Sequence, residues 1–266
     1  MTDERPIGMF DSGFGGLTVA RAVIDLLPNE HLVYLGDTGR YPYGPRPLEE
    51  VRAFARQIAH RLVDDHDIKL LVIACNNASA AALDVLRDEL AMPVVGVIEP
   101  GVRSLVKATR NRRVGVIGTV GTIASGAYQR AVTEVADDVR LTCAACPGFV
   151  EFVERGETEG DQVLVLAERL LAPIVEAKVD ALLLGCTHYP YLARTISDVV
   201  GRDVVLVSSA DETAFDVLAL LHDSDLAREG GPGTHRFLSS GEVTWFRSLG
   251  RLLLGPELAD VEGVRW

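Results

Sequence analysis

The chain has 266 residues, of which 48% are hydrophobic and 24% are charged, and its formal net charge is -12. This length and composition predict a globular protein with a sizeable core, built as one large domain or two small ones. Nucleic acid is a poor candidate partner, because phosphate binding needs a clustered positive patch and no run of Lys and Arg stands out.

The beginning of the sequence and its apolar runs bear on the compartment. The first residues lack the basic region and the long apolar region of a signal peptide. No apolar run approaches the roughly 18 to 20 residues that span a bilayer, so no membrane association is expected. The cytoplasm is therefore the expected location, where the four cysteines are expected as thiols rather than as disulfides.

Apolar runs alternate with amphipathic stretches along the chain, which is typical of βα units and a mostly parallel sheet. Runs with few charges predict buried strands at Ile7–Phe10, His31–Gly36, Leu70–Ala74, Val94–Val97, Val114–Ile117, Ala181–Leu184 and Val204–Val207. The stretches with helical periodicity predict helices at Leu17–Leu27, Leu48–Asp65, Ala78–Glu89, Pro100–Thr109, Ser125–Val135, Gly160–Glu176, Asp211–Leu221 and Trp245–Leu254.

Two segments of the first half of the chain are echoed in the second half. The glycine turn Ile7–Gly16 is matched by Val114–Thr122, and Leu71–Asn77 is matched by Leu182–His188 at nearly the same spacing. The echo predicts two similar parallel-sheet α/β domains related by pseudo-symmetry, with the active site in the cleft between them. The expected domains are residues 1–97 with 208–266, and residues 98–207.

Cys75 and Cys186 occupy matching positions in this echo. Each ends an apolar run and precedes small polar residues, and a helix start at that point is expected to lower the thiol pKa from its usual value of about 8.5. Cysteine is also a common small core residue, but the matched pair favours function. Two thiols flanking one Cα form a two-base racemase that needs no cofactor, whereas a single nucleophilic cysteine would indicate acyl transfer.

The turn Asp11–Gly16 is rich in glycine but has neither the dinucleotide-binding spacing nor the P-loop ending. It is either a tight βα turn or a binding loop in which Ser12 donates to a substrate carboxylate. In the second case Asp11 orients an amine or tunes the neighbouring thiol. The loop Gly36–Gly44 also follows a predicted strand, where ligand contacts often collect.

Other chemistry-bearing residues lie in the second half. His188 follows Cys186 by two positions, so it either assists that thiol or caps the next helix. Cys143 and Cys146 have the spacing of redox and zinc sites, but further ligands are not found nearby. We therefore expect no metal, and a structural role for this pair.

Several motifs together resemble the bacterial glutamate racemases. They occur in the family's order at residues 11–19 (DSGFGGLTV), 41–44 (YPYG), 74–76 (ACN), 145–147 (ACP) and 185–190 (GCTHYP). The resemblance extends to about residue 208. It implies cofactor-independent interconversion of L- and D-glutamate, which supplies D-glutamate for peptidoglycan and so for the cell wall and cell shape. It also implies a homodimer.

The resemblance assigns roles to individual residues. Cys75 deprotonates the D-enantiomer with help from Asp11, and Cys186 deprotonates the L-enantiomer with help from His188 and Glu154. The residues implied to bind substrate are Asp11, Ser12, Tyr43, Gly44, Asn76, Asn77, Thr187 and His188. Asn77 departs from the threonine common in the family, and Glu151 is the alternative to Glu154, since both would lie on the same helix face.

Two other functions are consistent with the sequence. One is racemisation of aspartate or another acidic amino acid, because pocket shape sets the substrate length. The other is a non-catalytic binding protein, since members of the family contact DNA gyrase. The presence of both thiols and their assistants favours catalysis.

Overall fold

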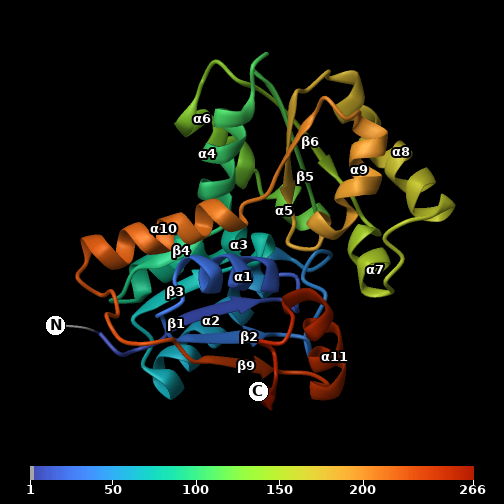
Figure 1. The fold of residues 1–266 in the computed structure, drawn as a ribbon. Coiled ribbons are helices and arrows are strands. Elements are labelled where there is room, and N and C mark those ends of the chain that lie inside the picture. The colour runs from blue at the N-terminus through green and yellow to red at the C-terminus, as the bar shows by residue number, and fades with distance from the viewer. Residues whose placement is uncertain (1–2) are drawn as a thin grey trace. The chain divides into compact units, whose positions relative to one another are not determined.

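The computed structural model describes residues 3–266, which form two compact units. The first unit joins the residues up to Val97 with Ala210–Trp266, and the second comprises Ile98–Ser209. Each unit is an α/β fold with its own parallel sheet (Figure 1). Among the helices of the described residues, none is long and apolar enough to cross a membrane.

The sheet of the first unit has six strands in the order β10-β9-β2-β1-β3-β4. All of its pairings are parallel. The strands are β1 (Ile7–Asp11), β2 (Leu32–Gly36), β3 (Leu70–Ile73), β4 (Val94–Gly96), β9 (His235–Ser239) and β10 (Glu262–Gly263). The central strands are buried on both faces, which explains why the sequence shows them as continuous apolar runs.

Helices cover both faces of this sheet. They are α1 (Leu17–Leu26), α2 (Leu48–His66), α3 (Asn76–Glu89), α10 (Ala210–Asp223) and α11 (Val243–Leu254). Side chains of β1 alternate between the two cores: Met9 packs with α1, α10 and α11, whereas Phe10 packs with α2 and α3. The alternation fixes which side chains at the strand ends meet which helices.

The sheet of the second unit has four strands in the order β6-β5-β7-β8, again all parallel. The strands are β5 (Arg113–Gly118), β6 (Arg140–Ala145), β7 (Ala181–Gly185) and β8 (Val205–Val207). The helical segments are α4 (Ile98–Ala108), α5 (Val120–Ala124), α6 (Ala127–Val135), α7 (Phe149–Glu154), α8 (Asp161–Glu176), the 3-10 helix η1 (Tyr189–Leu192) and α9 (Ala193–Val200).

The two sheets share one topology. Across the second sheet, its four strands along the chain are arranged as second, first, third, fourth. Strands β1 to β4 have the same arrangement in the first sheet. The echo seen in the sequence is thus a repeated βα arrangement, with β1 and β3 matched by β5 and β7. Two parallel-sheet α/β domains were predicted, and the structure confirms this fold class.

Some elements differ from the sequence-based predictions. Strands β6, β9 and β10 were not predicted, and neither was α9. No bounds were predicted for α7, although Glu151 and Glu154 were expected to share a helix face. Much of β6 is only partly buried, so its sequence lacks the long apolar run of a central strand. The predicted helix Ser125–Val135 corresponds to α6, which begins two residues later, after Gly126 at φ 70°. The short helix α5 before it was not predicted.

Candidate functional site

The first group of candidate residues gathers at the carboxyl ends of β1 and β3, which pair directly. Asp11 is the last residue of β1, and Ser12 follows it; Cys75 lies two residues beyond β3 and caps the N-terminus of α3. Ser12 hydrogen-bonds the Cys75 thiol, and the Asp11 carboxylate acts on it electrostatically. We call Asp11, Ser12, Cys75, Asn76 and Asn77 the first half-site.

The glycine turn after β1 is required by close packing. A Cβ on Gly16 would lie 2.6 Å from Cβ of Asp11 and 2.9 Å from Cβ of Ala74. Both distances are shorter than any real carbon contact, so only glycine lets α1 start against the half-site. Asp11 is fully buried, and its Oδ2 accepts a hydrogen bond from the Gly13 amide at 2.9 Å. The turn therefore orients the carboxylate beside the thiol.

The predicted effect on the Cys75 thiol was wrong in direction. Burial, followed by the charge of Asp11, raises the pKa of Cys75 to about 12. Hydrogen bonds with the Ala78 backbone and with Ser12 lower this pKa, but they are outweighed. The helix start is real, yet desolvation opposes a thiolate more strongly than the helix favours it. Burial and the Asp11 charge thus favour the protonated form of the Cys75 thiol.

Asn76 and Asn77 are the first two residues of α3, which begins two residues earlier than the predicted Ala78. Their side chains are almost completely buried, with 4% and 3% residue exposure. The amides of a first helical turn have no partner within the helix, so they can donate to a carboxylate. The two asparagines thus lie where a bound anion gains both backbone and side-chain donors.

The loop after β2 carries Tyr43 and Gly44. The Tyr43 ring is buried, and its hydroxyl donates to Oδ2 of Asp37, another buried carboxylate. Burial and then the charge of Asp37 raise the pKa of Tyr43 above its usual range. Since this hydroxyl is already engaged, the loop can offer a ligand the backbone amides of Tyr43 and Gly44 instead. Asp37 was not among the residues predicted from the sequence, although it lies in the predicted ligand loop.

The second group of candidates lies at the carboxyl end of β7. Cys186 and Thr187 follow this strand, and His188 precedes the 3-10 helix η1; all three are buried. Sγ of Cys186 lies 3.9 Å from Nδ1 of His188, and Nε2 of His188 lies 3.5 Å from Oε1 of Glu154. We call Cys186, Thr187, His188 and Glu154 the second half-site. Its thiol, imidazole and carboxylate form a continuous row.

The structure shows which of the two candidate glutamates, Glu151 or Glu154, lies beside His188. Glu154 is the last residue of α7, and its side chain is 15% exposed beside His188. Glu151, one turn earlier, is exposed. A T-shaped contact between Phe149 and Tyr189, with ring centroids 5.3 Å apart, packs α7 against η1. This packing brings Glu154 to the histidine.

Cys143 and Cys146 belong to β6 and the residue after it, and both are free thiols. Burial raises the pKa of Cys143 to about 11 and that of Cys146 to about 12. Cys146 is part of the core of the second unit, and its carbonyl accepts a hydrogen bond from the Tyr189 hydroxyl at 3.0 Å. Within residues 3–266, no cluster of three or more His, Cys, Asp or Glu could hold a metal ion.

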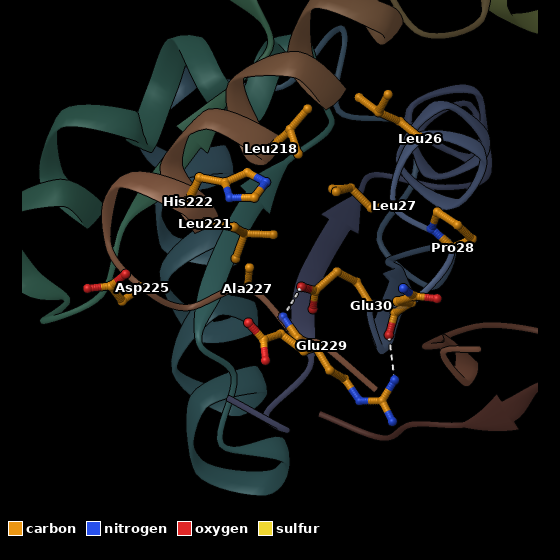
Figure 2. Close-up of a pocket in the computed structure, with 12 residues that line it drawn as sticks. Leu26, Leu27, Pro28, Glu30, Leu218, Leu221, His222, Asp225, Ala227 and Glu229 are labelled. Atoms are coloured by element: carbon orange, nitrogen blue, oxygen red, sulfur yellow. Dashed lines mark hydrogen bonds between the residues drawn. The ribbon is translucent and has the colours of Figure 1, made fainter. Parts of the chain in front are cut away.

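A pocket elsewhere in the first unit contains none of the candidate residues (Figure 2). It lies near the amino end of β2, between the end of α1 and the end of α10. Its Glu30 pairs with the buried Lys69 at 2.7 Å between Oε2 and Nζ, and the Arg228 amide donates to Oε1 of Glu30 at 2.7 Å. Because these charges are already paired within the chain, the pocket is a weaker candidate than the half-sites.

Comparison with known proteins agrees with this geometry. The family model for Asp/Glu/hydantoin racemases matches residues 16–214. A glutamate racemase from Acidothermus cellulolyticus is 55% identical over 258 residues, which is 96% of this chain and 97% of that protein. The chain therefore belongs to the Asp/Glu/hydantoin racemase family, and within it to the glutamate racemases.

Solved structures show the same relationship. The chain is similar to glutamate racemase isoform RacE1 from Bacillus anthracis, with a TM-score of 0.93 and 38% identity over 99% of this chain and 98% of that one. Glutamate racemase from Francisella tularensis in complex with D-glutamate has a TM-score of 0.92 and 35% identity, over 98% of each chain. Both similarities span both units.

Proposed function

We propose that this chain interconverts L- and D-glutamate without a cofactor, with Cys75 and Cys186 acting on opposite faces of the substrate Cα. The observation that carries the proposal is the repeated topology, which gives each unit one buried thiol at the end of the third strand of its βα repeat. A protein without a two-sided proton transfer has no physical reason to carry a thiol and an acidic assistant at both places.

In the D-to-L direction, the Cys75 thiolate removes the α-proton and becomes a thiol. The Cys186 thiol gives its proton to the opposite face of the carbanion and becomes a thiolate. One turnover therefore leaves the two cysteines with exchanged protonation states. The L-to-D direction reverses both steps and restores the starting states. A positioned side chain that transfers a proton in the transition state increases the reaction rate about 10²- to 10⁴-fold.

Ionisation of Cys75 needs help, because its pKa is raised to about 12 in the free protein. We propose that the substrate ammonium binds beside Asp11 and offsets the negative charge that opposes the thiolate. The amides of Asn76 and Asn77, together with Ser12, would hold a substrate carboxylate at the start of α3. Binding and activation of the first thiol would then be one event.

The second half-site has a histidine, rather than a carboxylate, next to its thiol. His188 lies between the Cys186 thiol and the Glu154 carboxylate, at 3.9 Å and 3.5 Å. We propose that the imidazole takes up and returns the thiol proton, and that Glu154 stabilises the imidazolium this produces. Thr187 is proposed as a further donor to substrate.

The wider role is also a proposal. D-Glutamate made in the cytoplasm would supply peptidoglycan synthesis and so cell-wall formation and cell shape. We further propose that two copies of the chain associate as a homodimer, which light scattering would measure. Contact with DNA gyrase, the second role that the resemblance implies, would be measured by a direct binding assay with the purified proteins.

The decisive experiment measures racemisation of glutamate and of aspartate by the wild-type chain and by Cys75→Ser, Cys186→Ser and the control Cys143→Ser. We expect turnover of glutamate, at least 10²-fold loss in each half-site variant, and near wild-type rates in the control. Preferred turnover of aspartate would contradict the proposed substrate. Near wild-type activity in either half-site variant would contradict the two-thiol mechanism.

A further inference from the structure

Trp266 lies far from both cysteines in the sequence but is bound to the loop that carries Tyr43. Its indole Nε1 donates to Oδ1 of Asp37 at 2.9 Å. Its ring covers the guanidinium of Arg40, with 4.0 Å between the Arg40 Cζ atom and the ring centroid. The same Arg40 Cζ atom lies 4.2 Å from the ring centroid of Phe54. A guanidinium that packs against two aromatic rings is stabilised by cation–π interactions, which are stronger when the cation is removed from water.

Asp37 connects this stack to the proposed substrate loop. Its side chain has no exposure, and both oxygens accept hydrogen bonds. Oδ1 accepts from Trp266 and, at 2.6 Å, from the Ser240 hydroxyl. Oδ2 accepts from Nε of Arg40 at 2.7 Å and from the Tyr43 hydroxyl. Hydrogen bonds from such donors stabilise the charge of a buried carboxylate, so the loss of one donor weakens the remaining hydrogen bonds of the network.

The segment before Trp266 is fixed to the body of the first unit. Strand β10 pairs with β9, and the Val264 amide donates to the Ser239 carbonyl at 2.8 Å. Nη1 of Arg61 donates to the Arg265 carbonyl at 2.7 Å. The segment that carries the indole is thus attached to the first unit next to Asp37.

We propose that Trp266 is a positioning residue for substrate binding, and this inference rests on the proposed glutamate racemase function. Through Asp37 and Arg40, it holds the Tyr43 ring in place and so fixes the direction of the Tyr43 and Gly44 amides. The Tyr43 ring also packs on Phe54, with centroids 5.7 Å apart, so the stack and the loop move together. Trp266 itself takes no part in proton transfer.

Steady-state kinetics of Trp266→Ala and Trp266→Phe test the proposal. Trp266→Phe keeps a ring over Arg40 and loses the donor to Asp37, whereas Trp266→Ala loses both. We expect KM for both enantiomers to rise about tenfold in Trp266→Ala and about threefold in Trp266→Phe. The reason is that the loss of one hydrogen bond to a charged group and of one cation–π contact weakens binding by about these factors. In both variants kcat should change less than twofold. Leu252→Ala, which removes a side chain that is 82% exposed, is the control and should leave KM unchanged.

Hydrogen exchange in the substrate-free protein gives a second readout that does not depend on activity. We expect the amides of residues 37–44 to exchange faster in Trp266→Ala than in the wild type, while β1 and β3 remain protected. An unchanged KM, or unchanged exchange in residues 37–44, overturns the inference. If the wild-type chain does not turn over glutamate, the proposed function fails, and the exchange experiment still decides whether Trp266 orders the loop.

Discussion

The two half-sites occupy the same place in a repeated topology but are built from different assistants. In the first, a carboxylate at the end of β1 lies beside Cys75, and burial with this charge raises the thiol pKa to about 12. In the second, a histidine separates the Cys186 thiol from the carboxylate of Glu154. The repeated fold therefore determines where each thiol lies, whereas the local sequence determines which charged and polar groups surround it.

The largest expected effect breaks the symmetry between the thiols. In Cys186→Ala, racemisation should fall at least 10²-fold, but Cys75 should still exchange the α-proton of D-glutamate with solvent deuterium, because it needs only its own face of the substrate. In Cys75→Ala, exchange should persist instead from L-glutamate. NMR of each enantiomer in heavy water measures both rates. Exchange lost from both enantiomers in either variant would contradict the assignment of one face to each thiol.

The second prediction compares the assistants. His188→Asn should reduce racemisation about 10²-fold, since it removes the group proposed to accept the Cys186 proton. Glu154→Gln should have a smaller effect of about tenfold, because the imidazole remains and loses only a charge partner. Glu151→Gln is the matched control and should be neutral, since its side chain is exposed. A loss as large in Glu151→Gln as in Glu154→Gln would show that the row of three groups is not used.

The third prediction compares Gly16, which precedes α1, with Gly118, the last residue of β5. Gly16→Ala should destabilise the first unit by about 1–3 kcal/mol and displace Asp11, because the new Cβ meets carbon atoms of buried neighbours. Gly118→Ala should cost less, since its Cβ would lie 3.1 Å from Cδ1 of Ile123 and 3.2 Å from the Gly185 carbonyl. Urea unfolding of both variants compares them. Equal midpoints would show that the two turns are packed alike.

The fourth prediction isolates Asp11. Asp11→Asn should lower the pKa of Cys75, because the charge that opposes the thiolate is removed. Alkylation of Cys75 by iodoacetamide at pH 8 should therefore become several times faster, although racemisation becomes slower. Mass spectrometry of the modified peptide reports the rate. An alkylation rate equal to that of the wild type would mean that burial alone sets this pKa.

The smallest expected effect is a dependence of stability on alkaline pH. The Cys75 pKa is raised from 9.0 to about 12 in the folded chain, so folding favours the neutral thiol. Below about pH 9 both states keep the proton and this stability is fully present; above it the unfolded chain loses its proton first. Stability should thus fall as pH rises from about 9 towards 12. The decline in urea midpoint between pH 8 and 10.5 should be smaller in Cys75→Ser, and an equal decline would contradict the raised pKa.

The α/β class, the repeat and the two matched cysteines could be predicted from the sequence alone. Buried parallel strands produce unbroken apolar runs, and the residues that follow them are read directly from the chain. The motif resemblance then determined the family. These features are local, so no knowledge of distant contacts was needed.

Features that depend on residues distant in the sequence could be seen only in the folded chain. The pKa of Cys75 follows from burial and from Asp11 on another strand, which is why the sequence-based direction was wrong. The choice of Glu154 follows from the packing of α7 on η1, and the role of Asp37 follows from donors as distant in sequence as Trp266. Desolvation and buried hydrogen bonds depend on what surrounds a group in space, and a linear pattern does not contain that information.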